Sequence, residues 1–175
     1  AVSLFIEKDK ERAKELAQLL QTDNTNRREA DASITEQAIA MLEADQTLHE
    51  KKAIVVFSEH WHKGVIGIVA SRLLERYYKP TIVLTKSGDL LAGSARSIAG
   101  FNIHDGLEYC SDLLFGFGGH YFAAGMTMVS ENLEAFKNRF EEIAASTLSD
   151  DQMIPELLIH SEIDLSDLTP SFFHI

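Results

Sequence analysis

Apolar residues in the first fifty positions recur at helical spacing and are separated by charged side chains. The i, i+3, i+4, i+7 repeat predicts a helix over residues 9–21, with Asp9 placed to cap its first turn. A second helix is predicted over residues 27–50. The polar run 23–26 between them is interpreted as a break, or as a kink in one longer helix. Residues 1–50 are therefore predicted to form a charged helical arm that links two domains.

After residue 52 the pattern changes to short apolar runs of strand length that alternate with amphipathic segments. This alternation predicts an α/β fold in which a mixed β-sheet is flanked by helices and preceded by a long helical interdomain arm. The continuous run 53–57 is typical of a strand covered on both faces. Strands or strand-like runs are predicted at 1–6, 53–57, 81–85, 90–96, 123–129 and 157–159. Helices are predicted at 64–78, 103–114 and 133–144, and a glycine-rich loop at 116–119.

The charge of the chain is unevenly distributed. Its net value of −11 argues against a nucleic-acid partner for the chain as a whole. However, residues 1–50 carry 11 acids and 6 bases, and residues 131–175 carry 10 acids and 2 bases. Residues 51–130 carry 6 acids and 8 bases, a net charge of +2. A site for a polyanion is therefore expected in this middle part of the chain.

The single cysteine, Cys110, excludes an internal disulfide and fits a reducing compartment. It is interpreted as a small apolar residue on a helix. The apolar runs are short and broken by charge, so no membrane span is predicted. The protein is expected to be cytoplasmic and to have no membrane partner.

A polar turn that leads into a helix is the first of three glycine-rich segments in the middle of the chain. It covers residues 61–73 and places Gly64 and Gly67 early in the predicted helix. Free N–H groups at a helix N-terminus bind anions, and His62 or Lys63 would add a donor to a phosphate. The alternative is that the glycines allow close contact between helix and sheet, and that His62 caps the helix.

The second segment places Arg96 between two serines, Ser94 and Ser97, where a predicted strand ends. A guanidinium group donates two parallel hydrogen bonds to phosphate oxygens, and each serine adds a hydroxyl donor. The three side chains are candidate phosphate contacts. The alternative is that Arg96 is an ordinary surface residue.

In the third segment, four glycines occur within the eleven residues 115–125, and His120 follows two of them, Gly118 and Gly119. Consecutive glycines bring backbone N–H groups close to a ligand that a side chain would obstruct. A histidine beside them donates to a phosphate oxygen or transfers a proton. Gly118 and Gly119 are candidate phosphate contacts, and His120 is the candidate catalytic residue.

Other kinds of site lack their sequence patterns. The chain has neither a G-x-x-x-x-G-K-[ST] loop nor a G-x-G-x-x-G turn after a strand, which excludes the common nucleotide-binding loops. It has no cysteine pair and no H-E-x-x-H helix for zinc, and no D-x-D pair or Asp-His-His triplet for two divalent ions. No metal site is predicted in this chain.

In this order, the three segments resemble the DHH-associated domain of the RecJ exonuclease family. That domain carries W-H-x-G-V-I-G-I-V-A-S-R, then G-S-x-R-S, then F-G-G-H-x-x-A-A-G, and the resemblance covers roughly residues 53–148. The charged arm looks like the family's interdomain helix, and the tail near Glu162 looks like the approach to a following OB-fold domain. The resemblance implies three regions: a helical interdomain linker (1–50), a DHH-associated substrate-binding domain (51–148) and the truncated start of an OB-fold-like domain (149–175).

The resemblance also implies a function. The intact protein would be a metal-dependent phosphodiesterase that degrades single-stranded DNA from the five-prime end in DNA repair and recombination. Manganese or magnesium would bind in a separate DHH catalytic domain of the same polypeptide, so this fragment is expected to be inactive alone. Ser94 and Arg96 would hold the DNA backbone, and Gly118, Gly119 and His120 would face the scissile phosphate. Two alternatives stay open: a related DHH-family oligonucleotide or nucleotide phosphodiesterase, and a pure nucleic-acid-binding module.

Overall fold

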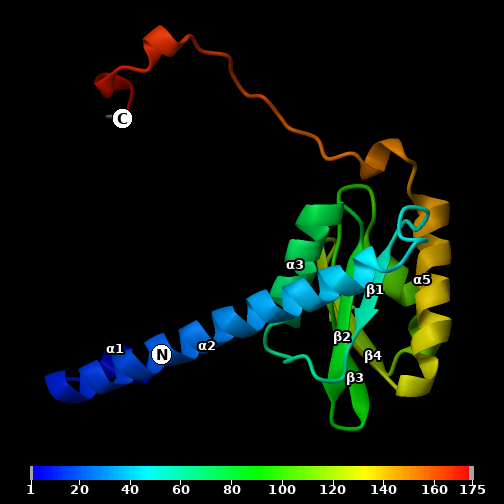
Figure 1. Ribbon diagram of the computed structural model, residues 1–175, viewed down its shortest axis with the longest axis horizontal. Coiled ribbons are helices and arrows are strands. Elements are labelled where there is room, and N and C mark those ends of the chain that lie inside the picture. The colour runs from blue at the N-terminus through cyan, green and yellow to red at the C-terminus, as the bar shows by residue number, and fades with distance from the viewer. Residues whose placement is uncertain (1, 174–175) are drawn as a thin grey trace.

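Five strands form one mixed sheet in the order β1-β2-β3-β5-β4. The computed structural model describes residues 2–173, and Figure 1 shows α3 and α5 on opposite sides of this sheet. The pair β1–β2 is parallel and the other pairs are antiparallel. The predicted α/β class, with a mixed sheet flanked by helices, is confirmed. The strands are β1 (Ile54–Phe57), β2 (Thr81–Ser87), β3 (Leu90–Arg96), β4 (Gly116–Gly119) and β5 (Ala123–Met128). The helices of this body are α3 (Ile66–Tyr77), α4 (Ile103–Tyr109) and α5 (Leu133–Thr147).

The arm is one helix rather than two. Helix α2 (Lys10–Glu43) is continuous through the polar run 23–26, so of the two interpretations one longer helix is correct and a break is wrong, and the helix ends earlier than residue 50. The hydroxyl groups of Thr22 and Thr25 donate to carbonyl oxygens one turn back in the helix. These polar side chains therefore bond to the helix itself and do not interrupt it. The predicted cap is confirmed, because the Asp9 carboxylate accepts from the backbone N–H of Arg12 at 2.8 Å.

The C-terminal half of α2 is packed into the body (Figure 1). Ile34, Ala38 and Leu42 are buried against α3 and the loop before it. The Asp31 side chain is 4% exposed and accepts from the Arg72 guanidinium of α3 at 2.6 Å. This half of the arm is fixed by apolar burial and by a largely buried carboxylate, whereas its N-terminal half projects from the body.

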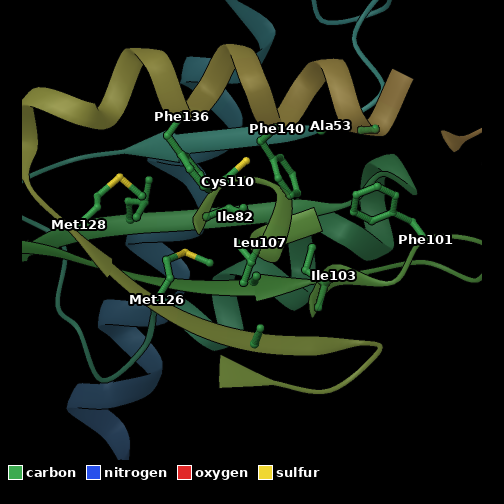
Figure 2. Packing of buried hydrophobic residues seen from close by; sticks show 14 of the residues in the cluster. Ala53, Ile82, Phe101, Ile103, Leu107, Cys110, Met126, Met128, Phe136 and Phe140 are labelled. Atoms are coloured by element: carbon green, nitrogen blue, oxygen red, sulfur yellow. The ribbon is translucent and has the colours of Figure 1, made fainter. Parts of the chain in front are cut away.

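The core on the other face of the sheet is built around phenylalanine rings. In Figure 2, Phe136 and Phe140 point from α5 toward the sheet, and both are fully buried. The Phe101 ring meets the Phe140 ring edge-on at 5.8 Å between centroids. Cys110 is fully buried in the same cluster, and burial raises the pKa of its thiol to about 11. Cys110 is therefore an apolar residue of the core as interpreted, but it lies one residue past the end of α4 and not on the helix.

Several predicted elements differ from the structure, which makes residues 2–6 a short helix, α1 (Val2–Ile6), and residues 116–119 strand β4. The helix predicted over 103–114 ends as α4 at Tyr109 and is followed by the 3₁₀ turn η1 (Ser111–Leu113). Residues 157–159 form no strand and are exposed. Strand β1 lies at a sheet edge and is covered on both faces as predicted, but unequally: Ile54 and Val56 are buried in the core on the α3 side, whereas Val55 and Phe57 pack against the core on the α5 side and are only partly buried.

The remaining elements are short 3₁₀ turns. These are η2 (Ser130–Asn132), η3 (Asp151–Met153), η4 (Leu165–Asp167) and η5 (Pro170–Phe173). Among residues 2–173, no helix combines the length and the apolar character needed to cross a membrane. After α5 the chain leaves the body as an extended tail (Figure 1), and the end of the predicted third region, residues 174–175, lies outside the described residues.

Candidate nucleic-acid interface

One face of the sheet is only partly covered. Helix α3 packs against β2 and β3, and no comparable helix covers β5 and β4 on that face in the described part of the chain. The strand register aligns Val83, Ser94, Gly125 and Gly118 in one row across β2, β3, β5 and β4. Residues directly opposite in antiparallel strands share a face of the sheet. The second and third glycine-rich segments are therefore brought together beside α3.

A groove of about 540 Å³ lies at this open part of the face. Glycines form much of its floor because a bare backbone leaves room above the sheet. None of the lining residues is an aspartate or a glutamate. The groove is lined by Lys63, Gly64, Ile66, Gly67, Ala92, Gly93, Ser94, Gly116, Phe117, Gly125, Met126 and Thr127.

The first segment meets the second through Gly67. A Cβ atom at Gly67 would lie 3.1 Å from the Ser94 hydroxyl oxygen and 3.2 Å from Nη2 of Arg96. Any larger residue in this first turn of α3 would push against both polar groups. The interpretation of Gly67 as a close contact between helix and sheet is therefore confirmed. The same contact positions Ser94 and Arg96, the two side chains that are candidates to bind phosphate.

The Arg96 side chain is held in place and keeps donors free. Its Nη1 donates to the Ser94 hydroxyl at 3.1 Å and to the Ala95 carbonyl oxygen at 2.8 Å. A guanidinium group has five N–H donors. Within residues 2–173, neither Nε nor Nη2 of Arg96 donates to a protein group, and no carboxylate pairs with this side chain. The Arg96 guanidinium is therefore held in one orientation, its positive charge is not paired with a carboxylate, and its Nε and Nη2 donors stay free of protein acceptors in residues 2–173.

The two serines beside Arg96 have different surroundings. Ser94 lines the groove. Ser97 is 7% exposed, and its hydroxyl donates to the Phe101 carbonyl oxygen at 2.7 Å. The structure places the Ser97 side chain in a buried turn and not in the groove, because strand β3 ends one residue before it.

The third segment forms an exposed hairpin at the sheet edge. A Cβ atom at Gly118 would meet nothing within 4 Å, whereas one at Gly119 would clash with the backbone of Ala123 and Ala124. His120 is exposed, and its backbone N–H donates to the Ala123 carbonyl oxygen at 2.8 Å. Ala123 pairs with Arg96 across β5 and β3, which puts the His120 backbone two strands from Arg96, roughly 10 Å away.

His62 lies outside the groove. Its Nδ1 accepts from the Gly64 backbone N–H at 3.1 Å, and no side chain caps α3, whose N-cap is Val65. The His62 ring lines a second hollow of about 420 Å³ between the loop and the arm, together with Asp23, Asn26 and Arg27. Lys63, the next residue, lines the groove itself.

The groove offers no ligands for Mg²⁺ or Mn²⁺, which prefer carboxylate oxygens, since its lining contains none. His104, Asp105 and Glu108 of α4 have ligand atoms within 4.8 Å of one another. These three residues belong to the helix that packs on the opposite face of the sheet and do not line the groove. The groove therefore does not fit a divalent metal centre.

Sequence comparison identifies the family. The model of the DHHA1 domain matches residues 50–146, which is more than half of the chain. The chain belongs to the DHHA1 domain family. It is 40% identical over 171 residues to the single-stranded-DNA-specific exonuclease RecJ of Bacillus subtilis (strain 168), a match that covers 97% of this chain and 22% of that protein. The chain thus spans about a fifth of the length of this curated relative.

Solved structures agree with this assignment. RecJ of Thermus thermophilus in complex with Mg²⁺ is 34% identical, with a TM-score of 0.73, and the match covers 82% of this chain and 22% of that one. The complex of the same protein with Mn²⁺ is 33% identical, with a TM-score of 0.72, and the match covers 81% and 20%. The resemblance to RecJ expected from the three motifs is confirmed.

Some groove residues of this DHHA1 domain were not among the predicted contacts. Gly67, Gly125 and Thr127 line the groove with the predicted Ser94. Gly125 lies in the third glycine-rich segment, so its presence in that motif was the available signal. Its position beside Ser94 depends on the register of β3 and β5, which sequence alone does not fix.

Proposed function

We propose that this DHHA1 domain is the substrate-binding part of a longer single-stranded-DNA-specific exonuclease that acts in DNA repair and recombination in the cytoplasm. The observation that carries the proposal is the carboxylate-free, glycine-rich groove, beside which the Arg96 guanidinium is held against two lining residues, Ser94 and Gly67. Relatives named as RecJ exonucleases support the substrate class. Cleavage from the five-prime to the three-prime end follows from the same resemblance.

Arg96 and Ser94 are proposed to hold the sugar–phosphate backbone. The free Nε and Nη2 donors suit two phosphate oxygens, because guanidinium binds phosphate through parallel hydrogen bonds. The glycines at 118 and 125 leave the sheet surface open, so a phosphate reaches backbone groups without meeting a side chain. Such contacts bind any base sequence, as an exonuclease that degrades single strands regardless of their sequence requires.

His120 is proposed to face the scissile phosphate across a cleft between this domain and a DHH catalytic domain of the same polypeptide. Its exposed position at the hairpin end suits a residue that donates to, or exchanges a proton with, a group held partly by another domain. Manganese or magnesium is proposed to bind in that other domain, since the groove supplies no carboxylate. The 175-residue chain alone is therefore expected not to hydrolyse DNA.

The proposal is tested by binding of single-stranded oligonucleotides to Arg96→Ala at several salt concentrations. Affinity should fall to the same extent for different base sequences, and the log–log salt slope should become shallower by about 0.7 for one lost phosphate contact. Arg76→Ala is the matched control, because Arg76 is an exposed arginine of α3 paired with Glu43. Unchanged affinity and slope in Arg96→Ala, with a normal thermal melt, would remove Arg96 from the site.

A further inference from the structure

Most basic residues of the middle region have their charge compensated by partners within the described part of the chain, and those whose charge is not compensated indicate where an anion would bind. Residues 51–130 contain eight lysines and arginines. Four of them, at 51, 52, 72 and 76, form salt bridges, and Lys79 donates to two backbone carbonyl oxygens. Within the described residues this leaves Lys63, Lys86 and Arg96 without a carboxylate partner. Two of these three lie at the groove, Lys63 in its lining and Arg96 beside Gly67.

Lys63 lies at the opposite end of the groove from Arg96. Its Nζ donates to the Ser87 hydroxyl at 3.3 Å, at the last residue of β2. This bond is long and its acceptor is a neutral hydroxyl, so the ammonium charge is not compensated and two of its three N–H donors stay available to an anion. Ser87 shares a face with Thr85, whose hydroxyl donates to the carbonyl oxygen of Trp61 in the loop before α3. The contact therefore stands on the α3 side of the sheet.

The register gives the separation of the two cationic ends. Ser87 pairs with Leu90, and Ser94, to which the Arg96 guanidinium donates, lies four residues further along β3. Four residues of strand span about 13 Å. This distance exceeds one step between neighbouring phosphates of a nucleic-acid strand. Apart from Lys63 the lining carries no charge, and it includes the small residues Ala92, Gly125 and Thr127.

We propose that the groove takes a single strand of several nucleotides along β3, with Lys63 holding a backbone phosphate at least two nucleotides beyond the phosphate held by Arg96. This inference rests on the proposed function and deepens it. Lys63 would contribute only when the ligand is long enough to reach both ends of the groove. The site would then favour polymers over dinucleotides, which separates it from the alternative of a nucleotide or short-oligonucleotide phosphodiesterase.

The test compares two probes on the 175-residue chain: a five-prime-phosphorylated thymidine dinucleotide and an oligothymidylate of about twelve nucleotides, a length typical of single-strand sites. Chemical-shift titration or fluorescence anisotropy gives the affinities. Lys63→Ala should weaken binding of the long probe, flatten its salt slope by about 0.7, and leave the dinucleotide unaffected. Lys63→Arg should retain the affinity for the long probe. Arg96→Ala should weaken binding of both probes.

Lys86→Ala is the matched control, because Lys86 is an exposed, unpaired lysine next to Ser87 whose side chain lies on the other face of the sheet by strand alternation. It should bind both probes as the wild type does. If Lys63→Ala weakened both probes equally or neither, while Arg96→Ala still weakened both, the inference about Lys63 would be overturned and the proposed function would stand. A wild-type chain that bound neither probe would overturn both.

Discussion

The two faces of the sheet use the same residue types for different purposes. On the α5 face a glycine makes room for an aromatic ring: a Cβ at Gly106 would lie 2.8 Å from the Phe101 ring. On the groove face, a Cβ at Gly118 would meet nothing within 4 Å. The first glycine is required by packing, whereas the second leaves free space on strand β4, two strands away from Ser94 on the same face. Gly118 therefore stays a proposed contact for a ligand from outside the chain.

Histidines show the same contrast. His104 packs its ring at 5.5 Å from the Phe117 ring on the covered side, and His120 is exposed at the end of the β4–β5 hairpin. If the groove face carries the function, substitutions there should change binding or turnover with little change in stability. Substitutions on the α5 face should do the reverse.

The largest effect is expected for His120→Ala in the full-length enzyme. Turnover should fall by about 10²–10⁴-fold, with a smaller change in DNA affinity, because a group that acts on the reacting phosphate stabilises the transition state more than the bound substrate. Single-turnover kinetics and equilibrium binding measure the two quantities. His104→Ala is the control and should keep wild-type turnover. A loss of affinity alone would make His120 a positioning residue.

A substitution in the core should change the free energy of unfolding by about as much as His120→Ala changes the activation free energy. Phe140→Ala removes a fully buried ring that contacts Phe101 and Phe136, and should lower the free energy of unfolding by about 3–5 kcal/mol. Urea denaturation measures this. Oligonucleotide affinity, determined where the variant is still folded, should stay at the wild-type value. A variant of normal stability would contradict the assignment of this cluster as the core.

The two glycines give a matched pair with a smaller effect. Gly106→Ala should cost about 1–3 kcal/mol, since the new methyl group overlaps the Phe101 ring. Gly118→Ala should leave stability within about 0.5 kcal/mol, because it adds a methyl group in open space. Only Gly118→Ala should weaken oligonucleotide binding. Reduced binding in a folded Gly106→Ala and normal binding in Gly118→Ala would reverse the roles given to the two faces.

The smallest effect lies outside both faces, where the arm meets β1. The Lys51 ammonium and Thr47 hydroxyl bonded to Asp45 hold the pKa of that carboxyl far below its usual range. Because the pKa of Asp45 is lower in the folded state, its ionised carboxylate stabilises the fold fully above the unfolded pKa of about 3.9. This contribution to the free energy of unfolding is lost as the pH falls below that value. With a third of the side chain exposed, it should stay below about 1 kcal/mol.

Urea denaturation between neutral and acid pH tests this expectation for Asp45→Asn. The variant should be less stable than the wild type at neutral pH and equal to it in acid. Asp89→Asn, in the exposed β2–β3 turn, serves as the control and should match the wild type throughout. If the stability of Asp45→Asn fell further below that of the wild type as the pH was lowered, the sign derived from the depressed pKa of Asp45 would be contradicted.

The sequence alone determined the elements whose residues carry strong local signals. Strand β3 has the predicted bounds, Leu90–Arg96, and α5 begins at the predicted Leu133, because apolar periodicity records which side is buried. Asp9 was recognised as a cap from its place before a helical repeat. The three glycine-rich motifs also identified the family and the candidate phosphate ligands, since residue type and order are properties of the sequence.

Tertiary structure decided the rest. Residues 116–119 have low strand propensity, and they form β4 because pairing with β5 satisfies their backbone groups. Ser97 and Ser94 look alike in sequence, yet the end of β3 turns one hydroxyl into the body and leaves the other in the groove. The contact of Gly67 with Ser94 and Arg96 joins residues far apart in the chain. Such proximity follows from strand register and from the packing of α3, which no local pattern encodes.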